Sequence, residues 1–429
     1  MAKPRVAHLV LNRVLRLDVC LLKGISMRRT FLKLSVCVLT FVAVGAAYVA
    51  SAQAKEPEWQ KIVVCDKFRS EGAAFGDFNK DGAMDVVSGH IWYEGPDFKK
   101  EHQFMKGEDS YDPESYSNSF VNFVDDIDGD GWDDIVICPH PGLDGFWYKN
   151  PQNKTDGMWE EIPSTIELGN ESQAWEDVNG DGKAELIFNR NNWYGFAVPN
   201  RGDNYKEPWA FCPVSGEDAK YQRYFHGNGV GDINGDGRID LLEMDGWWEQ
   251  PEDISNVPWK FHEFKFAEAA SNILVSDFNG DGLNDVFTAW HCHLYGLLCW
   301  IQKRADNGDI TFEPNWIIPT EPDDNFFPKT SQLHSMALAD CNGDGVMDVV
   351  SGKRWLAHGS TGDVGTLDTP YLFWWETVRG ENGSVSFKCH VIDDDSGIGT
   401  QVLAQDVNGD SVPDFLVGNK KGCFVFLSK

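Results

Sequence analysis

The chain has 429 residues and a formal net charge of -30, because 67 Asp and Glu outnumber 37 Lys and Arg. This balance excludes a protein that binds nucleic acid through bulk charge, since phosphate contacts need a basic surface. A content of 42 Gly, 17 Trp and 13% aromatic residues excludes a disordered acidic chain. The length allows two or three domains, or one large repeat architecture.

The N-terminal region has the pattern of an export signal. Residues 27–54 combine a charged start, an apolar stretch and an Ala-Gln-Ala end. We predict that residues 1–26 precede the true start and that residues 55–429 form the mature protein. Arg28 and Arg29 resemble the twin-arginine motif, so the Sec and twin-arginine routes both remain open. We expect a periplasmic or extracellular protein with no membrane span after signal removal.

One nonapeptide recurs along the mature chain. The pattern D-x-[DN]-x-D-G-x-x-[DE] occurs seven times at intervals of 45 to 66 residues, and in the last copy Ser411 replaces the Gly. The copies start at Asp77, Asp126, Asp177, Asp232, Asp277, Asp340 and Asp406. A short apolar run that is typical of a strand follows each copy. A fixed motif at such intervals indicates a repeat architecture.

The nonapeptide has the chemistry of a site for a hard cation. Oxygen ligands at positions 1, 3, 5 and 9, with a turn at the glycine, suit Ca²⁺. An EF-hand is excluded because position 12 is not Glu (Ser88 in the first copy) and the flanks look like strands. A metal-free polar turn would explain one copy, whereas carboxylates clustered in every copy repel one another without a cation. We therefore predict up to seven structural Ca²⁺ ions. The predicted ligands are Asp77, Asn79, Asp81, Asp85, Asp126, Asp128, Asp130, Asp134, Asp177, Asn179, Asp181, Glu185, Asp232, Asn234, Asp236, Asp240, Asp277, Asn279, Asp281, Asp285, Asp340, Asn342, Asp344, Asp348, Asp406, Asn408, Asp410 and Asp414.

Six of the seven motifs are followed by an aromatic strand, and in four units one more strand follows. After the second motif these are residues 146–148 and 159–162. Four strands per unit are typical of a propeller blade. We predict an all-β, seven-bladed β-propeller over residues 55–429, with the motif joining the first and second strands of each blade. The tryptophans are expected to pack between blades.

The motif, its strand flanks and its repetition resemble the FG-GAP/VCBS repeat family, which includes the integrin alpha-chain propeller. The resemblance implies a propeller whose calcium loops are structural. The Trp-rich strands also resemble the propeller part of aldos-2-ulose dehydratases, which are lyases that act on oxidised sugars. That second resemblance implies an enzyme as an alternative to a binding module.

Polar residues are expected at one rim of the central channel, on the face opposite the calcium loops. Glu71, Glu171, His226 and His334 each lie six residues before a motif, and the turns between second and third strands add Arg190 and Arg354. Histidines with carboxylates suit a transition metal or an acid/base centre, with an arginine steadying an anion. We take these six residues as catalytic candidates. A merely hydrated polar rim is the alternative. Three histidines outside the rim, His102, His262 and His390, are expected to be packing residues.

Three functions therefore remain open for an exported propeller. The first is recognition of carbohydrate through the rim face. The second is a metal-assisted lyase on an oxidised sugar, with an additional transition metal at the rim. The third is a platform for an extracellular protein ligand. GxSxG, HExxH, GxGxxG and P-loop motifs are absent from the sequence, which excludes the chemistries that they serve.

The ring is expected to close by exchange of a strand between the chain ends. Residues 59–64 precede the first motif and match the outermost strands elsewhere, whereas the seventh unit is one strand short. We predict that this segment is the outermost strand of the last blade. Cys65 and Cys423 would then lie at the same edge, and we predict a disulfide between them.

Overall fold

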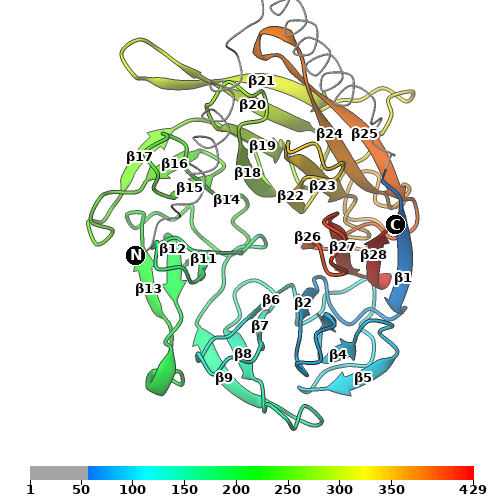
Figure 1. Ribbon diagram of the computed structural model, residues 1–429. Coiled ribbons are helices and arrows are strands. Elements are labelled where there is room, and N and C mark those ends of the chain that lie inside the picture. Colours follow the sequence, from blue (N-terminus) through cyan, green and yellow to red (C-terminus); the bar gives the residue numbers. More distant parts are fainter. Residues whose placement is uncertain (1–56) are drawn as a thin grey trace, which may run out of the picture. The chain divides into compact units, whose positions relative to one another are not determined.

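The computed structural model describes residues 57–429, so the predicted segments 1–26 and 27–54 lie outside the described residues. Short β-strands dominate, with two 3-10 turns at Gly202–Asn204 and Glu381–Gly383. The sheets are arranged around an open centre (Figure 1). The protein is an all-β propeller. Within residues 57–429, no helix is long and apolar enough to cross a membrane.

The strands form consecutive four-stranded meanders. In chain order they are β2 (Ala74–Gly76), β3 (Asp85–Ser88), β4 (Ile91–Glu94) and β5 (Lys100–Gln103); β6 (Val121–Asp125), β7 (Asp134–Cys138), β8 (Gly145–Lys149) and β9 (Glu160–Thr165); β10 (Ala174–Glu176), β11 (Glu185–Arg190), β12 (Trp193–Val198) and β13 (Ala210–Pro213); β14 (Asn228–Gly231), β15 (Asp240–Glu243), β16 (Gly246–Glu249) and β17 (Lys260–Glu263). They continue with β18 (Asn272–Ser276), β19 (Asp285–Ala289), β20 (Leu297–Arg304) and β21 (Ile310–Ile318); β22 (Met336–Ala339), β23 (Asp348–Gly352), β24 (Leu372–Arg379) and β25 (Val385–Asp393); β26 (Val402–Gln405), β27 (Asp414–Asn419) and β28 (Gly422–Ser428), which are joined by β1 (Trp59–Cys65).

The meanders form five sheets of four strands and one sheet of eight. The eight-stranded sheet consists of β14–β17 and β18–β21, joined where β14 and β18 pair in parallel through Asn228↔Asn272 and Gly229↔Ile273. All other pairings between named strands in residues 57–429 are antiparallel. The first strand of each meander lines the centre of the ring.

The chain ends close the ring as predicted. Strand β1 pairs antiparallel with β28, from Trp59↔Ser428 to Cys65↔Cys423. The predicted disulfide is wrong for this structure, in which both cysteines are free thiols. A register shift separates Val63 from Cys65, and the Cys65 sulfur accepts a hydrogen bond from the Lys67 N–H at 3.3 Å. The sulfur is thus turned toward the following loop although its strand register is the expected one.

The core lies between neighbouring meanders. One cluster joins Val87 and Trp92 of the first meander to Ile135 of the second, with Trp159 beside them. Trp92 and Trp147 have no exposed surface, which confirms the predicted packing role of the third-strand tryptophans. Burying such a side chain removes a large apolar surface from water, and this stabilises the contact between meanders.

The three outer histidines are packing residues, as expected. Each stacks on a tryptophan of the neighbouring third strand at a ring-centroid distance of 3.8 to 4.1 Å. The pairs are His102 with Trp92, His262 with Trp247, and His390 with Trp374. The Nε2 atom of each imidazole lies 2.6 to 3.0 Å from a glutamate, namely Glu94, Glu249 and Glu376.

Candidate functional site

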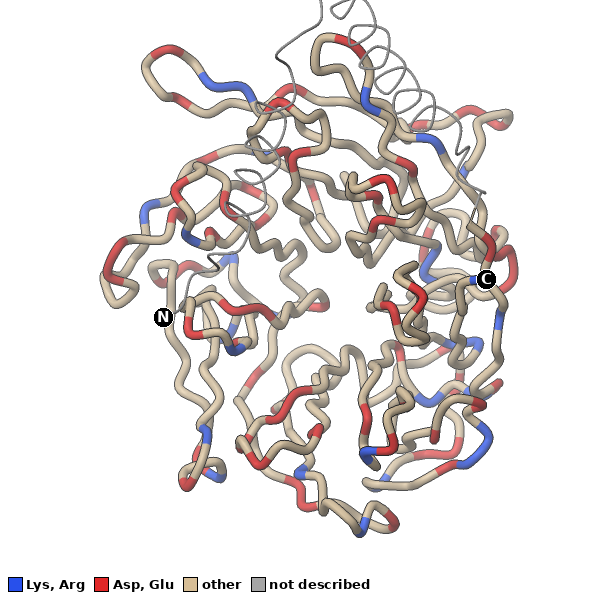
Figure 2. The backbone as a smooth tube through the Cα atoms, viewed as in Figure 1, with Lys and Arg blue, Asp and Glu red and all other residues tan. Residues whose placement is uncertain are grey.

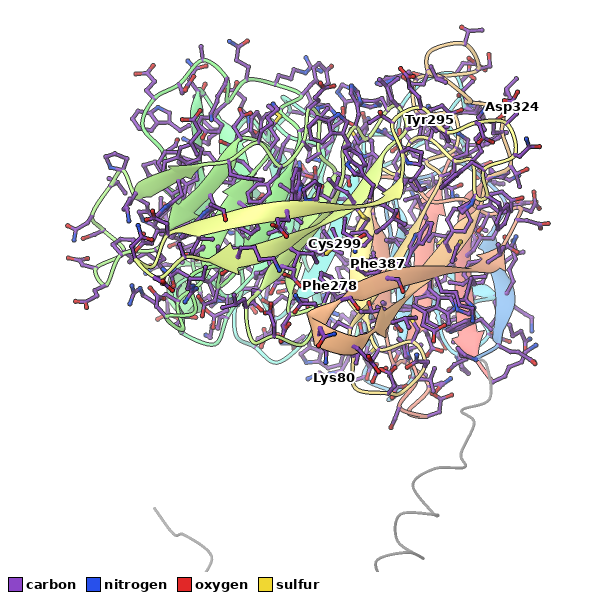
Figure 3. All side chains as sticks on the ribbon, turned by 90° about the horizontal axis from the view of Figure 1, so that it is seen from above. Lys80, Phe278, Tyr295, Cys299, Asp324 and Phe387 are labelled. Carbon is purple, nitrogen blue, oxygen red and sulfur yellow. The ribbon has the colours of Figure 1, made fainter. Side chains whose placement is uncertain are left out.

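The two faces of the ring carry different residues. Every nonapeptide joins a first strand to a second strand; the first copy, for example, lies between β2 and β3. Figure 3 shows Lys80 of that loop on one side of the molecule and Tyr295 and Asp324 on the other. The expected separation of acidic loops from the histidine-bearing rim is therefore present.

Backbone N–H groups organise the acidic loops. In the first loop, Asp81 and Gly82 donate to the two oxygens of Asp77, each at 3.1 Å. Asp81 also donates to Asn79 Oδ1 at 2.9 Å. Gly82 adopts a φ of 88°, in the region that favours glycine. In the seventh loop Ser411 takes the same place with a φ of 70°.

The ninth residue of the motif clamps the loop to the third strand of its meander. Asp85 accepts the Phe78 N–H at 3.0 Å and the Gly95 N–H at 2.8 Å. The same double acceptance occurs at Asp134, Asp240, Asp285, Asp348 and Asp414. Burial, with Asp81 and Asp77 nearby, raises the pKa of Asp85 to about 7.

The third copy shows why its ninth residue is Glu rather than Asp. The strand register places Pro199 where Gly95 stands in the first meander, and proline has no N–H to donate. Glu185 accepts the Val178 N–H at 2.9 Å, which is the bond that Asp85 makes with Phe78, and it also accepts the Asn179 N–H at 3.2 Å and the Asn179 side-chain amide at 2.6 Å. Both oxygens of the longer side chain thus bond within the loop, and this meander lacks the bond to its third strand.

The donor set of these loops fits a hard cation. Side-chain oxygens at positions 1, 3 and 5 point into one turn, and carboxylate and amide oxygens are what Ca²⁺ prefers. In the first loop these would be Asp77, Asn79 and Asp81, which remain accessible to solvent. The second loop differs, because the Lys149 ammonium contacts Asp128 and lies 2.6 Å from Asp130 Oδ2.

An arginine joins three meanders at the rim face. Arg354 donates to Glu71 Oε2 at 2.7 Å and to Glu171 Oε2 at 2.8 Å. All three side chains are almost completely buried. Burial by itself would raise the pKa of Glu171, but Arg354 and His334 hold it well below its usual value. The two glutamates carry one negative charge more than the arginine neutralises.

Histidines complete the cluster. His226 Nε2 lies 3.0 Å from His293 Nε2, and His334 Nε2 lies 3.2 Å from Glu171 Oε2. The potential ligand atoms of His226, Cys292, His293 and His334 all lie within 4.8 Å of one another. Burial and Arg354 lower the pKa of His334 to about 4, so its imidazole is neutral at physiological pH.

Several buried polar atoms of this cluster have no hydrogen-bond partner. They include Nδ1 of His334, Nδ1 of His293 and Oε1 of Glu71, whereas His334 Nε2 has the Glu171 oxygen at 3.2 Å. Buried polar atoms are normally satisfied, so such a group needs an explanation. Neutral imidazoles beside an uncompensated carboxylate are a donor set for Zn²⁺ or a similar ion. Their spacing is compatible with one shared metal.

Five of the six catalytic candidates therefore meet, and one does not. Arg190, at the end of β11, instead places its guanidinium 4.8 Å from the ring centre of Phe211. Cys292 was not among the predicted residues, and neither was a second group that shares His293 and is formed with His358 and Asp363. His358 and Asp363 lie in the long connection between β23 and β24. The 66-residue interval after Asp340, the longest in the chain, was the available signal.

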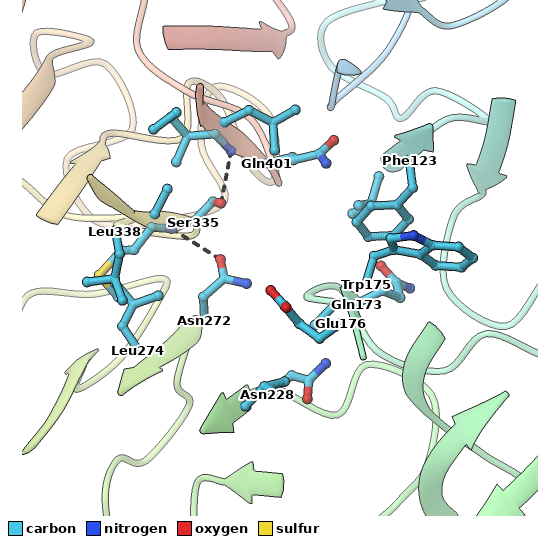
Figure 4. A pocket seen from close by; sticks show the side chains of 18 of the residues that line it. Phe123, Gln173, Trp175, Glu176, Asn228, Asn272, Leu274, Ser335, Leu338 and Gln401 are labelled. Carbon is cyan, nitrogen blue, oxygen red and sulfur yellow. Dashed lines mark hydrogen bonds between the residues drawn. The ribbon is translucent and has the colours of Figure 1, made fainter. Parts of the chain in front are cut away.

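The centre of the ring holds a cavity of about 480 Å³. Figure 4 shows Asn228, Asn272 and Gln401 around it, with Glu176 pointing inward. Asn272 accepts the Met336 N–H at 3.1 Å, so this side chain also joins two first strands. Acidic residues outnumber basic ones around the whole ring (Figure 2), which disfavours an anionic ligand.

Comparison with known proteins identifies the repeats. Residues 126–188 and 277–351 match the FG-GAP-like repeat family. The chain carries FG-GAP-like repeats. Both matched FG-GAP-like segments begin at the first aspartate of a motif. No curated protein matches the chain. The resemblance to aldos-2-ulose dehydratases stays a prediction.

Solved structures with a similar fold have little sequence in common with this chain. BBS1N, solved in complex with ARL6DN, is 9% identical with a TM-score of 0.48, over 86% of this chain and 96% of that one. A lectin from Agrocybe aegerita that recognises terminal N-acetylglucosamine is 16% identical with a TM-score of 0.43, over 84% and 88%. The extracellular domain of a one-component system from B. thetaiotaomicron is 12% identical with a TM-score of 0.45, over 86% of this chain and 40% of that one. At these values the similarities carry no argument about function.

Proposed function

We propose that the protein is an exported, calcium-binding propeller that recognises carbohydrate through its rim face. In this proposal the eight-stranded sheet counts as two blades, so the ring has seven. The acidic loops bind Ca²⁺ and hold the second strand of each blade in place. The observation that carries the proposal is the exposed Tyr224 ring beside His140, next to the buried cluster of His334, His293 and Glu71 at the rim.

Aromatic and polar groups beside that centre suit a sugar. The Tyr224 ring is 44% exposed and lies 5.7 Å from the His140 ring. The Arg223 guanidinium lies 4.7 Å from the Tyr224 ring and 3.0 Å from His140 Nδ1. A sugar has an apolar C–H face that stacks on an aromatic ring and hydroxyls that exchange hydrogen bonds with such groups.

A ligand panel tests the recognition proposal. Neutral mono- and oligosaccharides should raise the melting temperature of the wild-type protein, since a ligand that binds only the folded state stabilises it. His226→Ala with His334→Ala, and separately Tyr224→Ala, should abolish this shift. The double variant should keep the response of the melting curve to calcium. If saturable binding occurs and none of these variants weakens it, the ligand binds elsewhere and the proposal is wrong.

A second candidate function is a metal-assisted lyase on an oxidised sugar, and the histidine cluster favours it. His226, His293 and His334 would hold a transition metal, with Glu171 beside them. Such an ion supplies Lewis-acid polarisation of a carbonyl oxygen. Arg354 is committed to both glutamates, so it would act by positioning Glu171 rather than by binding substrate.

Metal analysis separates the two candidates. After dialysis against a weak chelator, the lyase requires one transition-metal ion per chain, and His226→Ala with His334→Ala should remove it. A recognition module would carry calcium alone. Incubation with 2-keto sugars, followed by NMR, then tests for loss of water from the substrate.

A further inference from the structure

The second acidic loop differs from the others at its third position. That residue is Asn in six copies of the motif and Asp128 in the second. The loop therefore has one carboxylate more than the pattern needs. An additional negative charge among clustered carboxylates destabilises the loop unless a cation compensates it.

The compensating cation comes from the same meander. Lys149 ends strand β8, where the corresponding residues of three other meanders are Glu94, Glu249 and Glu376. Its ammonium contacts Asp128 and lies 2.6 Å from Asp130 Oδ2. These are positions 3 and 5 of the motif, which supply ligands in a loop that binds a metal. The side chains of Lys149 and Asp130 are only 20% and 22% exposed.

The Lys149 ammonium contacts two of the four carboxylates of this loop and is covered by the next meander. Oxygens of Asp126, Asp128 and Asp134 lie within 4.8 Å of one another, and Asp126 Oδ1 is buried without a hydrogen-bond partner. The ring of Tyr205 lies 5.2 Å from the Lys149 ammonium. The next meander also covers the loop, because the Gly202 N–H donates to the Asp128 carbonyl at 3.0 Å. The internal cation is thus enclosed by protein.

Arginines at other loops do not do the same. Arg304 donates to the Asn234 carbonyl and Arg379 to the Phe278 carbonyl, both of which are main-chain groups. Arg238 contacts one carboxylate, that of Asp236. Among the described loops, only the second has a cation that bridges two carboxylates of the motif.

We propose that the Lys149 ammonium occupies the cation position of the second loop, so that this loop binds no Ca²⁺. The inference rests on the proposal that the remaining loops bind calcium. It differs at this loop from the prediction of a calcium ion on Asp126, Asp128, Asp130 and Asp134. One blade of the ring then keeps its loop folded without calcium.

Calcium stoichiometry of the purified protein tests the inference. Asp128→Asn with Lys149→Glu gives the second meander the residues of the first, which are Asn79 and Glu94. We expect equilibrium dialysis to show one more Ca²⁺ per chain in this double variant than in the wild type. Lys149→Met alone should also gain the ion, since it uncovers the carboxylates without adding a charge.

Terbium(III) luminescence assigns the change to this loop. Trp132 occupies the seventh position of the second motif, where the other copies have no aromatic residue, so its indole excites a terbium ion bound there. Trp132 also lies against the first loop, where Lys80 Nζ is 4.5 Å from its ring centre, so the measurement is made in an Asp81→Ala background that removes the ion of the first loop. In that background the otherwise unchanged protein should show no emission that depends on Trp132. The double variant should gain emission, and a further Trp132→Phe change should remove it.

The outcomes are distinct. A protein that binds no calcium at all contradicts the proposed function, and the inference falls with it. Calcium bound at the other loops, together with Trp132-dependent emission in the Asp81→Ala background, overturns the inference alone. A folded double variant that gains neither calcium nor emission also overturns it. If the double variant does not fold, comparison of Asp81→Ala with Asp81→Ala plus Trp132→Phe still decides the question.

Discussion

Arg354 and Glu71 are separated by 283 positions in the sequence, yet their side chains meet at 2.7 Å in the buried centre of the rim face. The contact ties the sixth meander to the first. Because Arg354 also binds Glu171, it ties the third meander to both. A single guanidinium therefore holds three parts of the ring together.

Removing this guanidinium should destabilise the ring. We expect Arg354→Met to lower the free energy of unfolding by about 3 to 5 kcal/mol, because two buried carboxylates lose their partner. Urea denaturation at pH 7.5 measures the change. Lys61→Met is the control, since its ion pair with Asp393 lies nearer the surface and should contribute only about 0 to 1 kcal/mol. Equal effects for the two variants would contradict the assigned role of Arg354.

Calcium should stabilise the folded ring. A bound ion contributes about 2.7 kcal/mol per site at a hundredfold excess over its dissociation constant. We expect excess chelator to lower the melting temperature markedly, and Asp281→Ala to lower it measurably in calcium. In chelator, Asp281→Ala should have a much smaller effect. A melting curve that chelator does not change would exclude structural calcium.

The sixth position of the motif offers a matched pair of variants. Ser411 adopts a φ of 70° in the seventh loop, and Gly282 a φ of 86° in the fifth. We expect Ser411→Gly to raise the free energy of unfolding by about 1 kcal/mol and Gly282→Ser to lower it by a similar amount. A Cβ at Gly282 would meet no atom within 4 Å, so the effect is conformational. Denaturant unfolding in saturating calcium measures the free energy of unfolding of both variants. Changes of the same sign in the two variants would refute this explanation.

Lys353 should make stability depend on alkaline pH. Burial lowers the pKa of Lys353 to about 8, from 10.5 in the unfolded chain, and its ammonium bonds to Gln332 Oε1 at 2.6 Å. Between these values the unfolded state binds more protons, so the stability contributed by this group rises with pH from 8 to 10.5 and is lost below 8. Relative to Lys353→Met, the wild type should gain roughly 2 kcal/mol between pH 7.5 and 10. If the denaturation midpoints of the two proteins change in parallel across that pH range, Lys353 is not the cause of the pH dependence.

Short stretches of the amino-acid sequence were enough to predict the repeat and the local structure of each unit. Position 1 of the motif, the glycine or serine at position 6 and the carboxylate at position 9 form hydrogen bonds within one turn or to the adjacent hairpin. Short stretches such as Asp77–Asp85 therefore determine the roles of these residues. The alternating apolar residues, and the tryptophan that every third strand except β28 contains, specify the strands in the same local way. The pairing of β1 with the last meander could also be predicted, by counting strands at the two chain ends.

Only the tertiary structure decided which rim residues meet. Register placed Glu71, Glu171, His226 and His334 on one face, but it could not show that Arg354 reaches the first two or that Arg190 turns toward Phe211 instead. His293, His358 and Asp363 come from turns and from a long connection that follow no repeat, so no periodicity predicts their positions. Replacement of the cation in the second loop by the Lys149 ammonium likewise depends on a side chain from another strand. Contacts of this kind depend on how meanders pack around the ring, and that packing is set by the summed burial of apolar surface between sheets rather than by any one motif.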